Sequence, residues 1–167
     1  MGLSLEQFAG ECHRILAANP GPEGRKQVCA LVEEACKDKD FVAANFGEGV
    51  GQRDILYEDP ELGFCVCAHA YKDARESQPH DHGTSWAIYG QVAGETVMND
   101  WALVEAAGEG KMGKVRFVRS YSLTPGMAHL YNEGDLHSPR RDGPTRLIRI
   151  EGKNMEKVKR YPYERVA

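Results

Sequence analysis

The sequence predicts a mainly β protein with a helical layer at its N-terminus. Residues 1–47 carry apolar side chains at helical spacing. From Ile55 onward, short stretches rich in Val, Ile, Tyr, Phe and Thr are separated by Gly, Pro, Asp and Asn. These stretches recur roughly every ten residues with no helix between them, which favours an antiparallel sandwich or barrel. Since no linker interrupts the chain, we expect one domain over residues 1–167, with the barrel at 53–162.

The helical layer is predicted from capping residues and apolar spacing. Ser4 should begin the first helix, because Gln7 stands three residues later in a capping box. That helix should end near Asn19 and Pro20. A second helix is predicted from about residue 23 to 38, and residues 41–46 are expected to add one more turn.

Eight strands are predicted in the remainder of the chain. They cover residues 53–58, 63–71, 86–92, 95–104, 114–122, 129–131, 145–151 and 157–161. The helical faces need a partner to cover them, and this sheet is the expected one.

Charge and composition exclude several classes of function. The formal net charge is −4, with acidic and basic residues mixed along the chain, so we expect no nucleic-acid binding. No apolar run approaches the roughly 18–20 residues of a membrane span, and we expect no membrane partner. The N-terminus lacks the pattern of a secretory signal, and the odd count of five cysteines favours reduced thiols. The predicted location is therefore the cytoplasm.

The cysteines at 65 and 67 admit two interpretations. They alternate with Val66 in an apolar run, which is typical of small buried side chains. The alternative is a Cys-x-Cys metal site, although no second cysteine pair completes it.

The most informative segment is QPHDHGTSWAIYG, residues 78–90. If it is extended, as Pro79 favours, His80 and His82 point to the same side of the chain. Two adjacent imidazoles can bind a divalent metal ion. The alternative is that both are polar residues of a solvated turn.

A third histidine stands more than fifty residues later in YNEGDLHSPRR. His137 lies there in a predicted turn before the apolar strand at 145–151, and a barrel would bring that turn close to the first pair. His129 is another candidate, as a third or fourth ligand, as a hydrogen-bond partner of the ligands or as a turn residue. We expect His69 to be a core or edge histidine and His13 to be solvated.

These motifs resemble the cupin superfamily, whose fold is a double-stranded β-helix or jelly roll. The first cupin motif is His-x-His, three or four residues, Glu, six residues and Gly, and here His80, His82 and Gly94 match it. Trp86 or Ala87 stands at the glutamate position. The resemblance implies a mainly β cupin jelly roll behind the N-terminal helical layer.

Cupins without that glutamate include the cysteine dioxygenase-like thiol dioxygenases, which this chain also resembles. In that family an arginine binds the substrate carboxylate a little under thirty residues before His-x-His, and Arg53 precedes His80 by 27. A Tyr-x-Asn-type strand stands eight residues before the family's third ligand. The same offset from His129 to His137 implies that His137 is the third ligand.

The chain departs from this family in one strand. The family's Ser-x-His-x-Tyr strand corresponds to residues 147–151, so Arg149 and Glu151 stand at the places of the His and Tyr. An inward Arg and Glu are costly unless they pair or serve a ligand. The family's crosslinking cysteine corresponds to Ala87, so that crosslink is absent. The ending PTRLIRIEG resembles uncharacterised bacterial cupins known only as predicted metal-dependent enzymes.

The resulting hypothesis is an Fe(II)-dependent dioxygenase acting on a small anionic or thiol-type molecule, with O₂ as co-substrate. Three histidines also accept Zn, Mn or Ni, so a non-redox isomerase or lyase remains open, as does a metal-containing sensor without turnover. A homodimer is possible, since jelly rolls have edge strands that can pair.

Two groups of residues are predicted around this metal. We expect Arg53 or Arg149 to bind the anion, with Tyr89, Trp86 and Met98 lining the pocket. Glu151 and His129 are expected to support the ligands without binding the metal. The alternatives are a surface salt bridge for Arg53 and a cross-sheet ion pair between Arg149 and Glu151.

Overall fold

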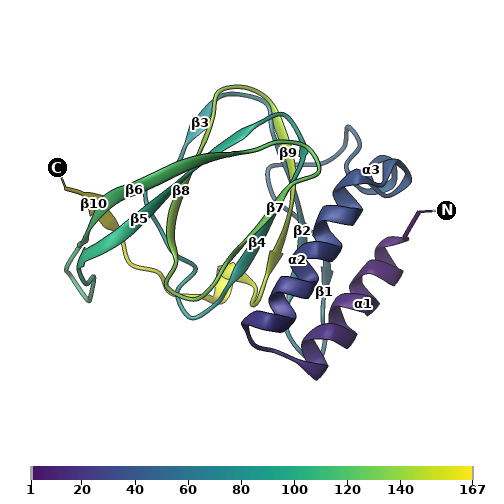
Figure 1. Ribbon diagram of the computed structural model, residues 1–167, viewed down its shortest axis with the longest axis horizontal. Helices are drawn as coiled ribbons and strands as arrows, with labels where there is room; N and C mark the ends of the chain where they lie inside the picture. The colour runs from purple at the N-terminus through teal and green to yellow at the C-terminus, as the bar shows by residue number, and fades with distance from the viewer. Residues whose placement is uncertain (1, 167) are drawn as a thin grey trace.

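The computed structural model describes residues 2–166, and its chain opens with helices (Figure 1). They are α1 (Leu5–Ala18), α2 (Pro22–Lys37) and α3 (Lys39–Asn45). The predicted start of α1 is confirmed: Ser4 Oγ accepts from the Gln7 backbone N–H, and Gln7 Oε1 accepts from that of Ser4. None of the helices within residues 2–166 is long and apolar enough to cross a membrane.

Ten strands follow within the described residues. They are β1 (Asp54–Glu58), β2 (Cys65–Tyr71), β3 (Arg75–Glu76), β4 (Ala87–Ala93), β5 (Thr96–Glu105), β6 (Gly113–Leu123), β7 (Ala128–Tyr131), β8 (Leu136–Arg141), β9 (Thr145–Glu151) and β10 (Tyr163–Arg165). A short 3₁₀ helix, η1 (Met155–Lys157), lies between β9 and β10. The first sheet has the order β1-β2-β9-β4-β7 and the second β10-β6-β5-β8-β3.

This strand order confirms the predicted fold class. From β2 to β9 the chain passes back and forth between the two sheets, except that the consecutive strands β5 and β6 pair in the second sheet. The resulting orders are β2-β9-β4-β7 in one sheet and β3-β8-β5-β6 in the other. Two such interleaved four-stranded sheets make the eight-stranded jelly roll, the double-stranded β-helix. All neighbouring pairs among these eight strands are antiparallel.

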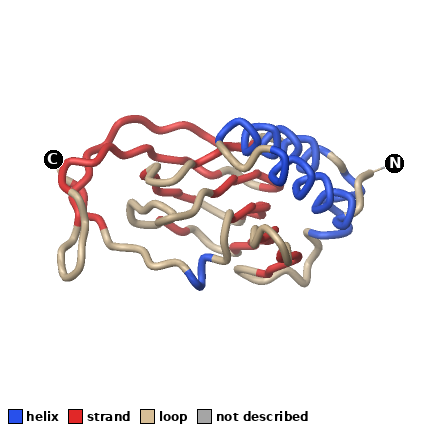
Figure 2. The backbone as a smooth tube through the Cα atoms, turned by 90° about the horizontal axis from the view of Figure 1, so that it is seen from below, coloured by secondary structure: helices blue, strands red, loops and turns tan. Residues whose placement is uncertain are grey.

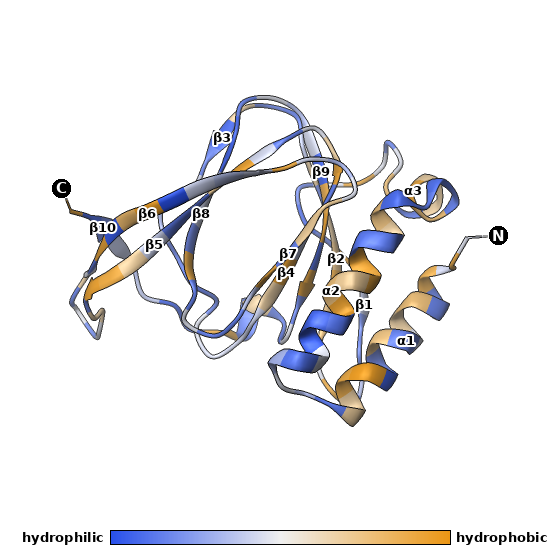
Figure 3. Cartoon of the chain, viewed as in Figure 1, coloured by the Kyte–Doolittle hydropathy of each residue, from blue (hydrophilic) through white to orange (hydrophobic). Residues whose placement is uncertain are grey.

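The first sheet lies between the helices and the interior of the barrel (Figures 1 and 2). Its helix-facing side carries apolar residues such as Val66, Ile88 and Ile150, which pack with buried residues of α1, α2 and α3. Hydrophobic and hydrophilic residues alternate along α1 and α2, as expected of helices with one buried face (Figure 3). The helical layer therefore covers one face of the sheet and leaves the barrel interior free.

One glycine lets α2 approach the sheet closely. A Cβ added at Gly90 in β4 would lie 2.5 Å from Val32 Cγ1 of α2 and 2.6 Å from Ile148 Cγ2. Real Cβ atoms essentially never make contacts this short, so only glycine fits here without displacing the helix. The close approach fixes the layer that buries the apolar face.

The strand predictions fail in three places, the first of which is the short strand β3, covered by none of the predicted strands. His137 was expected in a turn, but it belongs to strand β8, which lies between β5 and β3. The segment contains Pro139 and two arginines, so it lacks the apolar alternation by which strands are recognised. Residues 157–161 were predicted as a strand but contain the end of η1 and irregular chain. The C-terminal strand is β10 instead, which pairs parallel with β6.

Candidate metal centre

Three histidines from two segments of the chain converge inside the barrel. One ring nitrogen from each of His80, His82 and His137 lies within 4.8 Å of the others. The backbones of His80 and His137 form an isolated antiparallel bridge with two N–H···O bonds of 2.9 Å. The sequence-predicted trio is thus brought together, although through strand β8 and not through a turn.

Hydrogen bonds orient two of the three rings. Nδ1 of His80 lies 2.8 Å from the Gln78 carbonyl oxygen, and Nδ1 of His137 lies 2.9 Å from that of Asp135. A carbonyl oxygen only accepts, so each Nδ1 carries the proton and each neutral ring has its lone pair on Nε2. This is the arrangement in which a second hydrogen bond orients a metal-binding histidine.

The spacing of the nitrogens suits a metal ion. Nε2 of His82 lies 3.1 Å from Nε2 of His137. Two ligands at right angles and about 2.1 Å from an ion would have nitrogens about 3.0 Å apart. Without an ion, His82 can donate from Nε2 to His137, and its own buried Nδ1 then has no partner among residues 2–166. The donor set and its spacing therefore fit a first-row divalent metal.

The environment keeps all three rings neutral. Burial lowers the pKa of His80 to about 4 and that of His82 to about 2, and the charge of Arg149 adds to both effects. Burial and the two neighbouring histidines hold the pKa of His137 well below its usual value. At neutral pH the rings are unprotonated, which is the form that binds metals.

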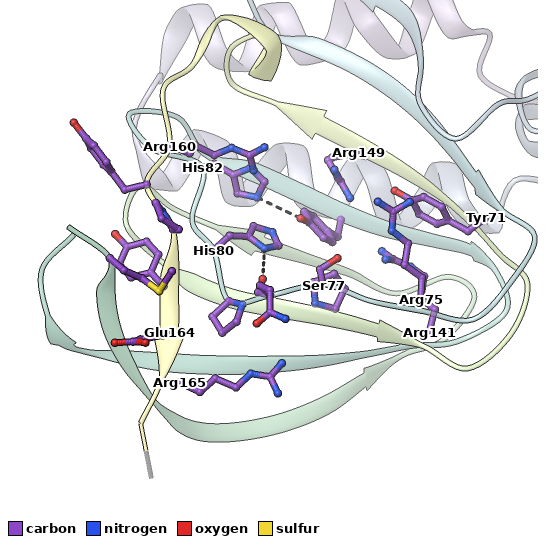
Figure 4. Close-up of a pocket in the computed structure, with 18 residues that line it drawn as sticks. Tyr71, Arg75, Ser77, His80, His82, Arg141, Arg149, Arg160, Glu164 and Arg165 are labelled. Atoms are coloured by element: carbon purple, nitrogen blue, oxygen red, sulfur yellow. Dashed lines mark hydrogen bonds between the residues drawn. The ribbon is translucent and has the colours of Figure 1, made fainter. Parts of the chain in front are cut away.

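Two of the three histidines, His80 and His82, open onto a cavity of about 860 Å³ (Figure 4). His80 and His82 form part of its wall, together with Tyr89 from β4 and Arg149 from β9. The remaining wall comes from the segments around β3 and β8 and from the C-terminal residues 160–165. Tyr163 of that C-terminal segment donates to Asp81, between the two histidines, at 3.4 Å.

The cavity is strongly cationic. Its lining contains a single acidic residue, Glu164, against five arginines: Arg75, Arg141, Arg149, Arg160 and Arg165. One of the five, Arg165, is paired with Glu76. A cavity with this lining attracts anions.

Tyr89 reaches the histidines directly. Its hydroxyl lies 3.3 Å from Nε2 of His82 and 3.3 Å from Nε2 of His137. Burial raises the pKa of this hydroxyl, so it remains protonated and can donate. On its other side, the Arg149 guanidinium lies over the ring at 4.3 Å from the centroid.

Arg53 and Glu151 form an ion pair outside the cavity lining. Arg53 Nη2 donates to Glu151 Oε1 at 2.8 Å, and Nη1 lies 3.3 Å from Glu156. The Cys67 thiol donates to the same Glu151 oxygen at 3.2 Å. The alternative in which Glu151 pairs with Arg149 is wrong, because the carboxylate is taken by Arg53. The structure thus separates the two arginines expected to bind an anion: Arg149 faces the cavity and Arg53 does not.

Four further residues lie away from the cavity. Trp86 belongs to the helix-facing core, where Arg25 covers its ring at 5.3 Å, and Met98 packs in the barrel core. His129 is stacked between Tyr121 and Tyr131, with ring centroids 5.0 and 4.6 Å away, and is not part of the histidine cluster. His69 is buried as predicted, with Nδ1 2.7 Å from the Gln52 carbonyl oxygen.

His13 and the cysteines complete the comparison with the sequence. The His13 side chain is only 31% exposed, and Nδ1 lies 2.9 Å from Asp59, so it is less solvated than expected. Cys65 and Cys67 are fully buried free thiols, as the first interpretation predicted.

Sequence reasoning missed two parts of this site, Arg141 and the C-terminal segment 160–165. Arg141 stands in the unrecognised strand β8, four residues after His137. The C-terminal segment carries two arginines and two tyrosines in RYPYER. Such a run at the end of a barrel was the one available signal that it belongs to a binding cavity.

Fold and site together define a jelly-roll protein with a three-histidine cluster suited to a metal ion. No protein-family model matches the chain, and no curated protein does. Solved structures with a similar fold include a protein with a double-stranded β-helix domain from Klebsiella pneumoniae, at 15% identity over 71% of this chain and 83% of that one, with a TM-score of 0.47.

Two further examples carry the same fold. A cupin-2 domain protein from Shewanella frigidimarina is 10% identical over 70% of this chain and 95% of that one (TM-score 0.45), and KdgF from Halomonas sp. is 17% identical over 59% and 76% (TM-score 0.44). Some of these neighbours are described as cupins, among them a cupin superfamily protein from Desulfitobacterium hafniense. At these identities the similarity concerns the fold alone.

Proposed function

We propose that this chain is a metal-dependent enzyme, an Fe(II) dioxygenase that acts on a small anionic or thiol-type organic molecule. One observation carries the proposal: the nitrogens of three neutral histidines converge, and two of these histidines, His80 and His82, line a cavity together with five arginines. The histidines supply a metal site, and the arginines select an anion.

The ligand set determines what a bound metal can do. Three neutral imidazoles leave the ion its full +2 charge and up to three positions for other ligands. Iron in such a site would bring substrate and O₂ together and pass electrons between them. A dioxygenase transfers both oxygen atoms to its substrate, so the reaction needs no external reductant.

The remaining cavity residues have roles that follow from their positions. Arg149 lies close enough to lower the pKa of all three histidines, so it can hold an anionic group beside the metal. Tyr89, with its hydroxyl 3.3 Å from two ligand nitrogens, can donate a hydrogen bond to a molecule bound there. Residues 160–165 line one side of the cavity and add Arg160 and Arg165 to its positive charge.

The proposal is tested by metal content and oxygen uptake. The protein is reconstituted with Fe(II) without oxygen, and uptake is then followed with thiols, β-diketones and hydroxylated aromatic acids. We expect about one metal per chain in the wild type and in the control His129→Ala, and little in His82→Ala or His137→Ala. Full metal retention in both ligand variants would refute the three-histidine site.

Oxygen uptake separates the classes of function. Uptake with one substrate, lost in His137→Ala and kept in His129→Ala, supports the dioxygenase. Stoichiometric metal without uptake on the whole panel contradicts it, and favours a sensor or a non-redox enzyme using Zn, Mn or Ni.

A further inference from the structure

A second group of cations lies at the end of the cavity away from the histidines. Tyr71 of β2 has the Arg75 guanidinium 4.9 Å and the Arg141 guanidinium 4.7 Å from its ring centroid. Arg75 and Arg141 are direct partners in the register of β3 and β8. Figure 4 shows Tyr71, Arg75 and Arg141 together on the side of the cavity away from His82, with Arg149 between the two groups.

Arg141 is buried without the partners that such a residue needs. It is 2% exposed, and its Nε and Nη2 atoms have no hydrogen-bond partner among residues 2–166. Nε of Arg149 is also buried and has no hydrogen-bond partner among the described residues. Six other arginines among residues 2–166 do have an acidic partner in an ion pair. They are Arg14, Arg25, Arg53, Arg119, Arg140 and Arg165.

An unpaired buried guanidinium is costly to the fold. Its desolvation is offset only by a charged or polar partner of good geometry, and apolar residues of similar size would be as stable or more stable. Burial lowers the pKa of Arg141 to about 10, so the group still carries its charge at neutral pH. Stability alone therefore gives no reason for the buried Arg141 beside the half-buried Arg149 in one cavity, whereas ligand binding does.

The chemistry of the subsite indicates a carboxylate. Guanidinium N–H groups match the two oxygens of a carboxylate in a bidentate pair. The Tyr71 ring packs against both guanidiniums and adds no further charge. We propose that Tyr71, Arg75 and Arg141 form a second anion subsite, which binds the carboxylate of a small organic acid.

The subsite also narrows the substrate class. Resting on the proposed function, we infer that the substrate is an organic acid with a carboxylate at one end and a metal-binding group at the other. Arg141 would hold the distal carboxylate, and the opposite end would reach the three histidines. A dicarboxylate is the simplest molecule with this arrangement.

The test uses full-length, metal-free protein and succinate as the dicarboxylate probe. Binding is measured by titration calorimetry, with neutral succinamide and inorganic phosphate as comparison probes. We expect succinate to bind, succinamide not to bind, and Arg141→Gln to weaken succinate at least about tenfold, since hydrogen bonds between charged groups are among the strong ones. The control Arg140→Gln, an exposed neighbour on the same strand paired with Asp142, should bind like the wild type.

Several outcomes would overturn the subsite. They are wild-type affinity in Arg141→Gln, equal affinity for succinamide, and binding of phosphate in preference to succinate. If Arg141→Gln does not fold, Arg75→Gln replaces an exposed residue whose guanidinium lies over the same tyrosine ring, and its affinity decides the question in the same way.

This experiment is independent of the proposed activity because it uses no metal and no oxygen. Succinate binding that depends on Arg141, in a protein that consumes no O₂, supports the subsite and refutes the dioxygenase. Oxygen uptake, in a protein whose succinate binding does not depend on Arg141, supports the dioxygenase and refutes the subsite.

Discussion

The two faces of the first sheet are built from the same strands and have opposite characters. On β9, Ile148 and Ile150 face the helices and are fully buried among apolar residues. Arg149 and Glu151, which alternate with them, lie on the opposite face, where Arg149 lines the cavity and Glu151 pairs with Arg53 outside the cavity lining. Since successive side chains of a strand point to opposite sides, each strand specifies a stabilising face and a chemical face at once.

The difference between the two faces shows which one carries side chains that are costly to bury. The helix-facing side follows the ordinary rules of a core. The cavity side holds neutral buried histidines and unpaired arginines, which the fold supports only because the other face is apolar and well packed. If the two faces are separable, a substitution on one should leave the property of the other intact.

The largest effect is expected at the ion pair between Arg53 and Glu151, which lies outside the cavity lining. Arg53→Met leaves the Glu151 carboxylate, 1% exposed, without its partner and should lower the free energy of unfolding by roughly 3–5 kcal/mol. Urea denaturation measures this loss. The double variant Arg53→Met with Glu151→Leu should recover most of it, and a double variant no more stable than the single one would contradict the pairing.

A core substitution on the opposite face should cost somewhat less and spare the site. Ile150→Ala removes buried methyl groups from the layer under the helices and should destabilise the fold by about 2–4 kcal/mol. Ile150→Val, as the graded control, should lose about 1 kcal/mol. Metal content per folded chain should not change in either, and a parallel loss of metal would show that the faces are coupled.

The buried histidines predict a pH dependence that the apolar face lacks. Burial, with a further contribution from Arg149, lowers the pKa of His69 to about 2, and that of His80 to about 4. Their unfolded pKa is near 6.5, so below this pH the unfolded chain binds protons that the folded chain excludes. Stability of metal-free protein should therefore be constant above pH 6.5 and fall below it, by up to about 1.4 kcal/mol per pH unit for each histidine.

The variant His69→Asn measures how much of this loss of stability at low pH is due to His69. Its unfolding free energy, measured between pH 4 and 7 in the presence of a chelator, should fall less steeply than that of the wild type. Identical slopes would mean that His69 is protonated in the folded protein.

The smallest expected effect has the opposite sign. Arg149→Met replaces a guanidinium that has a buried, unpartnered Nε by an apolar side chain and should raise the free energy of unfolding by about 1 kcal/mol. Succinate binding to the same variant should weaken. Denaturation and calorimetry on one preparation test both, and a destabilised variant would show that the contact with Tyr89 outweighs the cost of burial.

The sequence was most informative where a residue pattern is typical of a single structure or a single kind of site. The capping box of Ser4, the two helices and the His80, His82 and His137 cluster were all predictable, because capping, helical spacing and metal ligation are local or chemically distinctive. Strand β8 was not, because Pro139 and two arginines hide its alternation.

The destination of each charged side chain was also beyond the sequence. From the sequence alone, Arg53 and Arg149 are equally plausible anion ligands. Only the fold shows that Arg53 is paired with Glu151, whereas Arg149 faces the cavity. Arg141 is the same case, because its role depends on which strand lies beside it.

The lining of the cavity has a consequence for how fast ligands arrive. The whole chain carries a formal net charge of −4, whereas the cavity presents five arginines against one glutamate. An anion farther from the cavity mouth than the screening length, roughly 8–10 Å at physiological salt, feels almost none of the arginines' electrostatic field. Closer to the mouth, this field attracts it. Entry should therefore be accelerated only over the last few ångströms, and added salt should slow association far more than it speeds release.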